Sequence, residues 1–258
     1  MRRVDGAERV VTVLDLLSRA PEGLGVSDIA RELDVHRSTV SRLLGTLAAS
    51  GLVERDPVTR RFRLGTRILG LAATAMARLP VVSQARPLLE ELASVTSETA
   101  NLAVLDRFHV VYVDQIAPAQ TVVMRSWVGR RSPAHASSSG KVIMAFGDRR
   151  IREAVLRRPL EALTEHTMTD PSALRHQLDE VRSRGYATSR GELALDLISI
   201  AAPVRLDGQA VAAVSISGPP RRFPSGDLPR LAHAVVDAGA AIGHRLAGRT
   251  ITTRPSPA

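Results

Sequence analysis

The stretch "HRSTVSRLLGTLAASGLVERDPVTRRFRLG", His36 to Gly65, decides how the first part of this chain folds. Apolar residues recur in its first half at the three- and four-residue spacing of one helix face, and Gly51 stands where a helix C-cap is expected. Its second half alternates apolar residues with arginines around Asp56-Pro57, which is typical of two short strands and a turn. The stretch therefore predicts a helix that is followed directly by a β-hairpin.

Two further helices are expected before this stretch. Residues 4–20 carry apolar positions on one helical face, and "PEGLG" at 21–25 interrupts them. Residues 26–35, "VSDIARELDV", form a shorter amphipathic segment, for which Ser27 is the expected N-cap. The order helix, short helix, tight turn, longer helix and hairpin predicts a winged helix-turn-helix over residues 1–65.

The third expected helix would present a short, polar and basic set of side chains near its N-terminus. Such a set can contact bases and phosphates in the major groove, or it can be the solvated face of an ordinary helical hairpin. The hairpin that follows, with two arginines at its tip, favours DNA, as does the formal net charge of +9. The residues expected to contact a double-stranded DNA operator are Ser27, Arg37, Ser38, Thr39, Ser41, Arg42, Arg60 and Arg61.

Residues 66–79, "TRILGLAATAMARL", have an apolar stripe that is too broad for a lone solvated helix. This segment needs a partner, either within its own chain or in a second copy. From residue 80 onward, hairpin-linked strands alternate with helices; strands are expected at 100–116, 121–128 and 199–219, with a turn at Asp207-Gly208. The fold class is therefore α+β with an antiparallel sheet over 80–248, and residues 249–258 are expected to be a disordered tail.

The segment "PAHASSSGKVIMAF", residues 133–146, contains S-x-x-K, the pattern of a lysine-activated serine nucleophile. Lys141 is the only lysine, so the companion K-T-G motif cannot exist, and a phosphate-binding loop would need glycine at His135. The seven histidines form no tight ligand pair and cysteine is absent, so no metal, cofactor or catalytic residue is expected. What remains is a helix start near Lys141, which is either an anion site or a plain cap. Lys141 itself either touches a ligand or covers the helix surface.

Residues 23–72 resemble the winged-helix domain of the IclR family of bacterial transcription regulators, and the resemblance continues to about Leu246. It implies a linker helix over 66–79, a GAF-like effector-binding domain over 80–248, homodimers that often pair into homotetramers, and, in most members, repression.

The same resemblance implies a pocket for a small organic acid, which the likeness to regulators of aromatic-acid catabolism suggests is aromatic. Met124 and Trp127 would supply apolar wall for a ring. Asp196 stands where many members carry glycine, and it would disfavour a carboxylate unless Arg125 or Arg131 compensates. The pocket residues carried over are Met124, Ser138, Ser139, Ser189, Ser199, Ser215 and Ser217.

We therefore expect a transcriptional regulator, with two alternatives: a DNA-binding protein whose second domain only oligomerises, and a metabolite-binding enzyme with an accessory DNA domain. Charged residues interrupt the N-terminal apolar segment, which is not typical of a signal peptide, and there is no apolar run near 18 residues. A cytoplasmic location without membrane contact is the corresponding expectation.

Overall fold

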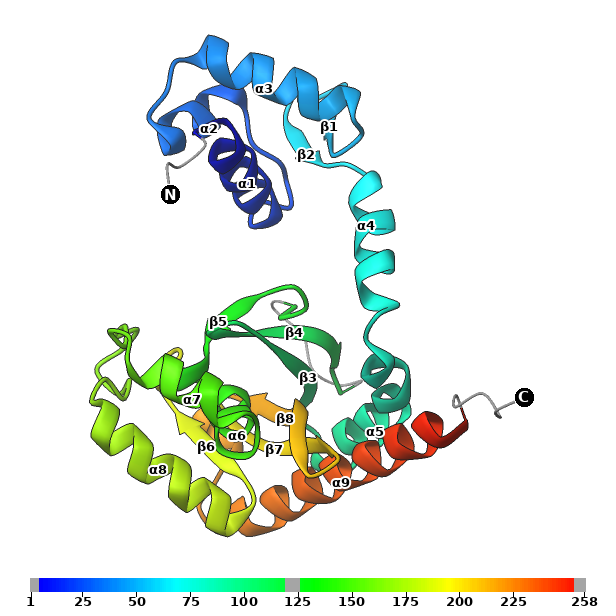
Figure 1. Ribbon diagram of the computed structural model, residues 1–258. Helices are drawn as coiled ribbons and strands as arrows, with labels where there is room; N and C mark the ends of the chain where they lie inside the picture. The colour runs from blue at the N-terminus through cyan, green and yellow to red at the C-terminus, as the bar shows by residue number, and fades with distance from the viewer. Residues whose placement is uncertain (1–4, 119–125, 253–258) are drawn as a thin grey trace. The chain divides into compact units, whose positions relative to one another are not determined.

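The computed structural model describes residues 5–118 and 126–252, and the chain divides into two compact units, Met1–Arg78 and Leu79–Ala258 (Figure 1). The first unit has the predicted order of elements. These are α1 (Asp5–Ser18), α2 (Val26–Leu33), α3 (Arg37–Ala49), β1 (Val53–Arg55), β2 (Phe62–Leu64) and α4 (Arg67–Met76).

Apolar side chains from the three helices and the hairpin form one core in the first unit. Ile29, Val40 and Leu44 are fully buried in it, and Phe62 of β2 joins them from the hairpin. The backbone of Phe62 also forms an isolated bridge with Leu24. The hairpin is therefore anchored to the helices by a side chain and by backbone hydrogen bonds, as a wing must be.

Helix α2 begins earlier than expected, so the prediction of Ser27 as its N-cap is wrong. The N-cap is Gly25, whose backbone N–H donates to a carboxylate oxygen of Asp28 at 3.2 Å. Ser27 lies inside the helix and is exposed. The tight turn after α2 depends on Asp34, which has the left-handed backbone conformation (φ 50°), and His36 then caps α3 by accepting from the N–H of Ser38.

The second unit is built on a six-stranded antiparallel sheet with the strand order β5-β4-β3-β8-β7-β6. This confirms the predicted α+β class. Its strands are β3 (Thr99–Asp106), β4 (His109–Ile116), β5 (Arg131–Pro133), β6 (Ala187–Arg190), β7 (Ile198–Leu206) and β8 (Gln209–Gly218). Its helices are α5 (Pro80–Thr96), α6 (Ser138–Phe146), α7 (Arg149–Leu156), α8 (Pro171–Arg184) and α9 (Leu228–Thr252), with short 3₁₀ turns η1 (Ala134–Ala136) and η2 (Pro220–Arg222).

Helices cover both faces of this sheet (Figure 1). Leu102, Ile200 and Ile216 face α5 and α9 in one apolar core. Ala103 and Ala201, from alternate positions of the same strands, face α6, α7 and α8 in a second core. Because side chains alternate along a strand, each face carries its own pattern, and the α6 face is the one that becomes polar toward one end.

Three boundaries in the second unit differ from the sequence expectations. In the strand expected over 121–128, positions 121–125 lie outside the described residues, and residues 126–128 are not in a strand. Helix α6 begins at Ser138 rather than near Lys141, because Ser137 caps it by accepting from the N–H of Gly140 at 3.1 Å. Helix α9 continues to Thr252, past the expected boundary at 248, since the first proline after it is Pro255.

No single helix among the described residues is long and apolar enough to cross a membrane. Only α4 taken together with α5, across the break between them, reaches the required length and composition.

Candidate functional site

The polar face predicted for α3 lies at the surface of the first unit. Arg37, Ser38, Ser41 and Arg42 are exposed, and Thr39 is half-buried. The opposite face of the helix supplies the core, so the packing of α3 leaves its basic N-terminal part free to enter a groove.

The tip of the hairpin is held by Asp56, whose carboxylate accepts the N–H groups of Val58 and Thr59 at 2.9 and 2.8 Å. The hydrogen bond from Thr59 holds the pKa of Asp56 below its usual range. Arg60 follows with a left-handed backbone (φ 60°) and is exposed. The guanidinium of Arg61 turns back and donates to the carbonyl of Gly23 at 3.1 Å, so it also ties the wing to the turn after α1.

Helix α4 has no buried residue, although most of its side chains are apolar. Leu69 and Leu71 are 69% and 54% exposed, and Met76 is 38% exposed. The described residues of the first unit thus leave the apolar stripe of α4 uncovered.

The predicted serines meet at the polar end of the α6 face of the sheet, and we call them the serine cluster. Ser189 pairs with Ser199, and Ser199 with Ser217, in the strand register, so these side chains share one face. The first turn of α6 lies against them. The serine cluster consists of Ser138, Ser139, Ser189, Ser199, Ser215 and Ser217.

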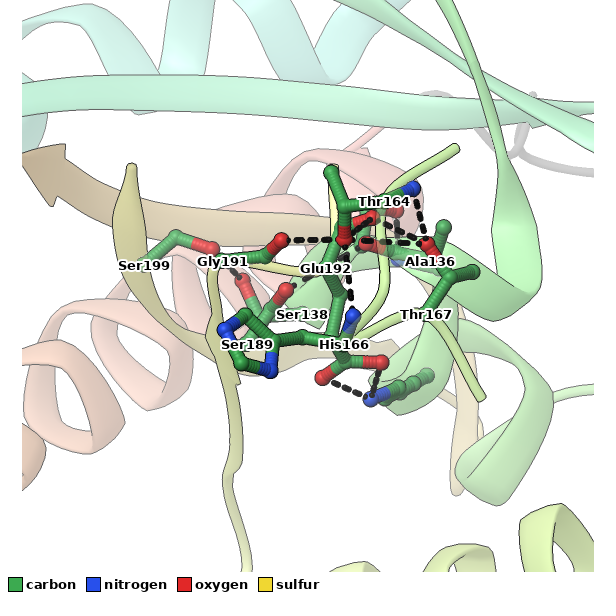
Figure 2. Close-up of polar contacts among 12 residues, drawn as sticks. Ala136, Ser138, Thr164, His166, Thr167, Ser189, Gly191, Glu192 and Ser199 are labelled. Carbon is green, nitrogen blue, oxygen red and sulfur yellow. Dashed lines mark hydrogen bonds and ion pairs between the residues drawn. The ribbon is translucent and has the colours of Figure 1, made fainter. Parts of the chain in front are cut away.

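Hydrogen bonds connect the helix to the strands within the serine cluster. Ser138 Oγ lies 2.7 Å from Ser199 Oγ (Figure 2). Ser139 Oγ donates to Ser215 Oγ at 3.3 Å. Ser189 Oγ donates to the carbonyl of Ala136 at 3.3 Å. All six serines are buried except Ser199, which is half-buried. The cluster is a largely buried set of hydroxyls at the positive end of a helix, which suits a small oxygen-bearing anion.

Two buried polar residues that the sequence reasoning missed adjoin the cluster. The amide nitrogen of Asn101 donates to Ser217 Oγ at 3.1 Å, while its carbonyl oxygen is buried and has no hydrogen-bond partner among the described residues. Burial raises the pKa of Tyr112 to about 12, although hydrogen bonds with Ser132 and Ser139 act against it. A polar residue in the middle of the apolar strand 99–106 was the available signal for Asn101.

The other residues named for the pocket are more scattered. Met124 and Arg125 lie outside the described residues. Trp127 packs against Tyr112 with ring centroids 5.5 Å apart, which places it near the cluster as expected. Arg131 is half-exposed and paired with Asp106 at 2.9 Å. Asp196 is exposed in the β6–β7 connection.

Lys141 is completely buried, so the interpretation that it covers the helix surface is wrong. Its Nζ donates to both carboxylate oxygens of Glu192, at 2.5 and 2.6 Å. Burial lowers the pKa of the Lys141 ammonium, while the charge of Glu192 acts in the opposite direction. The pair leaves the neighbouring serines without an uncompensated charge.

Within residues 5–118 and 126–252, no group of three or more histidine, aspartate or glutamate side chains is placed to hold a metal ion. The groups that the cluster offers to a ligand are its hydroxyls, the Asn101 amide and the N-terminal end of α6.

Two family models match the chain, one within the first unit and one over most of the second unit together with the end of the first. The model for the IclR helix-turn-helix domain matches residues 6–57, and the model for the C-terminal domain of bacterial IclR transcriptional regulators matches residues 73–244.

Individual proteins are similar over most of the length. The HTH-type transcriptional regulator BhcR of Paracoccus denitrificans is 37% identical over 244 residues, which cover 94% of this chain and 87% of that protein. The HTH-type transcriptional repressor AllR of Escherichia coli is 31% identical and covers 84% of this chain and 80% of its own. The crystal structure of an IclR homologue from Microbacterium hydrocarbonoxydans complexed with 4-hydroxybenzoate is 30% identical, with a TM-score of 0.79, and covers 94% of this chain and 99% of its own.

Proposed function

The chain belongs to the IclR family of bacterial transcriptional regulators, and we propose that it binds a pseudo-palindromic DNA operator as a homodimer or homotetramer and responds to a small organic acid. Like the relatives that it matches, it is a transcriptional regulator and not an enzyme. The single observation that carries the proposal is the exposed basic N-terminal face of α3, followed directly by an anchored wing.

On this proposal α3 enters the major groove. Arg37 and Arg42 contact guanine edges or phosphates, because a guanidinium can bind both acceptors of guanine. Ser38, Thr39 and Ser41 are short enough to let the helix approach. Their hydroxyls suit phosphate oxygens, and the methyl group of Thr39 suits the methyl group of thymine. Ser27, exposed on α2, is assigned a phosphate contact. Arg60 and Arg61 contact the flanking backbone or the minor groove, with Arg60 better placed because Arg61 also bonds Gly23.

The proposed oligomer is based on the exposed apolar side chains of α4. Its exposed Leu69, Leu71 and Met76 form apolar surface that a second copy would cover. A two-fold dimer would then present two α3 helices to half-sites about one helical turn apart, roughly 10 base pairs from centre to centre. Because the proposed operator is chromosomal DNA, the proposed location of the protein is the cytoplasm.

The serine cluster is proposed as the effector site, with Trp127 beside it as apolar wall. Hydroxyl donors at the N-terminal end of α6 favour a carboxylate, and the absence of an uncompensated charge favours a small, singly charged acid. The relative solved with 4-hydroxybenzoate supports an acid of this size. Repression is the proposed direction of control, in line with AllR. The acid would act by a different affinity for the DNA-competent and DNA-incompetent arrangements.

The test begins by selecting DNA from a random-sequence pool with the full-length protein. We expect an enriched inverted repeat, and fluorescence anisotropy should show that a panel of small acids, 4-hydroxybenzoate included, changes the affinity for it. Selection without any enriched sequence would refute the operator proposal. Operator affinity that is indifferent to every acid would instead favour a second unit that only oligomerises.

A further inference from the structure

The ion pair between Lys141 and Glu192 joins residues that are 51 positions apart in the chain (Figure 2). The side chain of Lys141 is 0% exposed and that of Glu192 is 10% exposed. Removing two charges from water costs about as much free energy as their attraction returns, so a buried pair is weak evidence for a stabilising role. The position of the pair in the fold indicates its role better than its stability does.

The two charged residues lie on the two segments that carry the serine cluster. Lys141 follows Ser138 by three residues in α6, which puts both on the same side of the helix. Glu192 is the second residue of the connection between β6, which carries Ser189, and β7, which carries Ser199. The ion pair therefore crosses between the same two parts of the fold as the 2.7 Å contact between Ser138 and Ser199.

The backbone around Glu192 is held separately by the loop before α8. Thr167 Oγ1 donates to the carbonyl of Glu192 at 2.7 Å, and Thr164 Oγ1 donates to the carbonyl of Gly191 at 2.6 Å. Thr167 Oγ1 also accepts the N–H groups of Leu163 and Thr164. These hydrogen bonds fix the backbone at Glu192, so its carboxylate has a defined position. The ion pair with this carboxylate then restrains Lys141 and the helix α6 that carries it.

We propose that Lys141 and Glu192 are positioning residues of the ligand site. Their ion pair holds the first turn of α6 at the separation from β7 at which Ser138 and Ser199 bind one ligand together. The inference rests on the proposed function, in which the serine cluster receives a small acid.

The experiment replaces both partners, Lys141→Met with Glu192→Met, so that no unpaired charge stays buried. The matched control is Arg86→Met with Asp114→Leu, which removes a 2.8 Å ion pair on the α5 face of the sheet. Hydrogen exchange measured by mass spectrometry on the ligand-free protein should become at least tenfold faster in peptides covering 134–141 and 189–199, with exchange in β3 unchanged. Calorimetric affinity for 4-hydroxybenzoate should fall at least tenfold in the test variant and stay unchanged in the control.

Unchanged local exchange in the paired variant would overturn the positioning role, whatever happens to ligand affinity. Faster exchange spread evenly over the second unit, with a lower Tm, would also overturn it, because that pattern belongs to a merely structural pair. Should the paired variant fail to fold, Lys141→Gln with Glu192→Gln also leaves no buried charge, and it must give a smaller increase confined to the same peptides. Wild-type protein that binds no acid would refute the proposed ligand instead, while the exchange data still decide the positioning role.

Discussion

Substitution of Gly140 tests most directly how closely α6 packs against the 3₁₀ turn η1. A Cβ at this position would lie 2.1 Å from the carbonyl oxygen and 2.4 Å from the Cα of Ala134 in the adjacent 3₁₀ turn. Both obstacles are backbone atoms, which cannot rotate away as a side chain can. Overpacking a core costs about 1–3 kcal/mol, and we expect Gly140→Ala to cost about 3 kcal/mol. That is roughly a 150-fold change in the unfolding equilibrium.

The same substitution at Gly248 is the matched control. It lies in α9 of the same unit, and its added Cβ would meet no described atom within 4 Å apart from its chain neighbours and the backbone of its own helix. Relief of the conformational entropy of glycine in a helix then stabilises by up to about 0.5–1 kcal/mol. One chemical change is thus expected to have opposite signs at two positions of one unit.

Urea unfolding, followed by the fluorescence of Trp127, measures the stability of both variants. Trp127 is the only tryptophan in the sequence, and it lies in the second unit. The midpoint should fall for Gly140→Ala and rise slightly for Gly248→Ala at unchanged slope. A Gly140→Ala midpoint at or above that of the wild type would show that α6 does not pack on the 3₁₀ turn as described.

Three further predictions concern the two proposed sites. Arg42→Ala should weaken binding to the selected DNA by about 1–3 kcal/mol in anisotropy titrations, while Arg149→Ala in the second unit should leave binding unchanged. Equal affinities of Arg42→Ala and the wild type would refute the contact of α3 with the major groove. Ser138→Ala with Ser139→Ala should lower the Tm of the free protein, because hydrogen bonds to Ser199 and Ser215 are lost, and should shrink the acid-induced rise above that Tm; a full rise would refute the ligand site. Burial raises the pKa of Tyr112 to about 12, so between pH 10 and 12 the unfolded state ionises first and stability falls as the pH rises. The loss is about 1.4 kcal/mol at pH 11, and urea midpoints at pH 9 and pH 11 should show it in the wild type but not in Tyr112→Phe.

Local patterns were sufficient for the first unit because its contacts are close in sequence. The strands β1 and β2 are separated by six residues, and Phe62 reaches a core whose other members all precede it within about fifty positions. Periodicity and turn residues therefore predicted every helix and strand of the winged helix. The misplaced cap of α2 shows the limit, because both glycine and serine are good N-caps and the reach of Asp28 to Gly25 decided between them.

The serine cluster could not be derived in this way. Ser138 meets Ser199 across 61 positions, Ser139 meets Ser215 across 76, and Asn101 meets Ser217 across 116. No local pattern reports such distances, so the six serines were named only through the family resemblance. Asn101 had a signal of its own, a polar side chain in an apolar strand, but its partner could be found only in three dimensions.

Lys141 illustrates what composition can and cannot say. Its being the only lysine excluded an acyl-transfer motif, yet it gave no reason for an ammonium at this position in a chain whose other 34 basic residues are arginines. The structure supplies that reason. A guanidinium brings five N–H donors in a rigid fork, and at a site with no exposure and one carboxylate several of them would be left unpaired. An ammonium has three donors, and Glu192 takes two of its bonds. The buried position therefore selects lysine by the number of donors that it can satisfy, which ties the identity of this residue to the closeness of α6 and the β6–β7 connection.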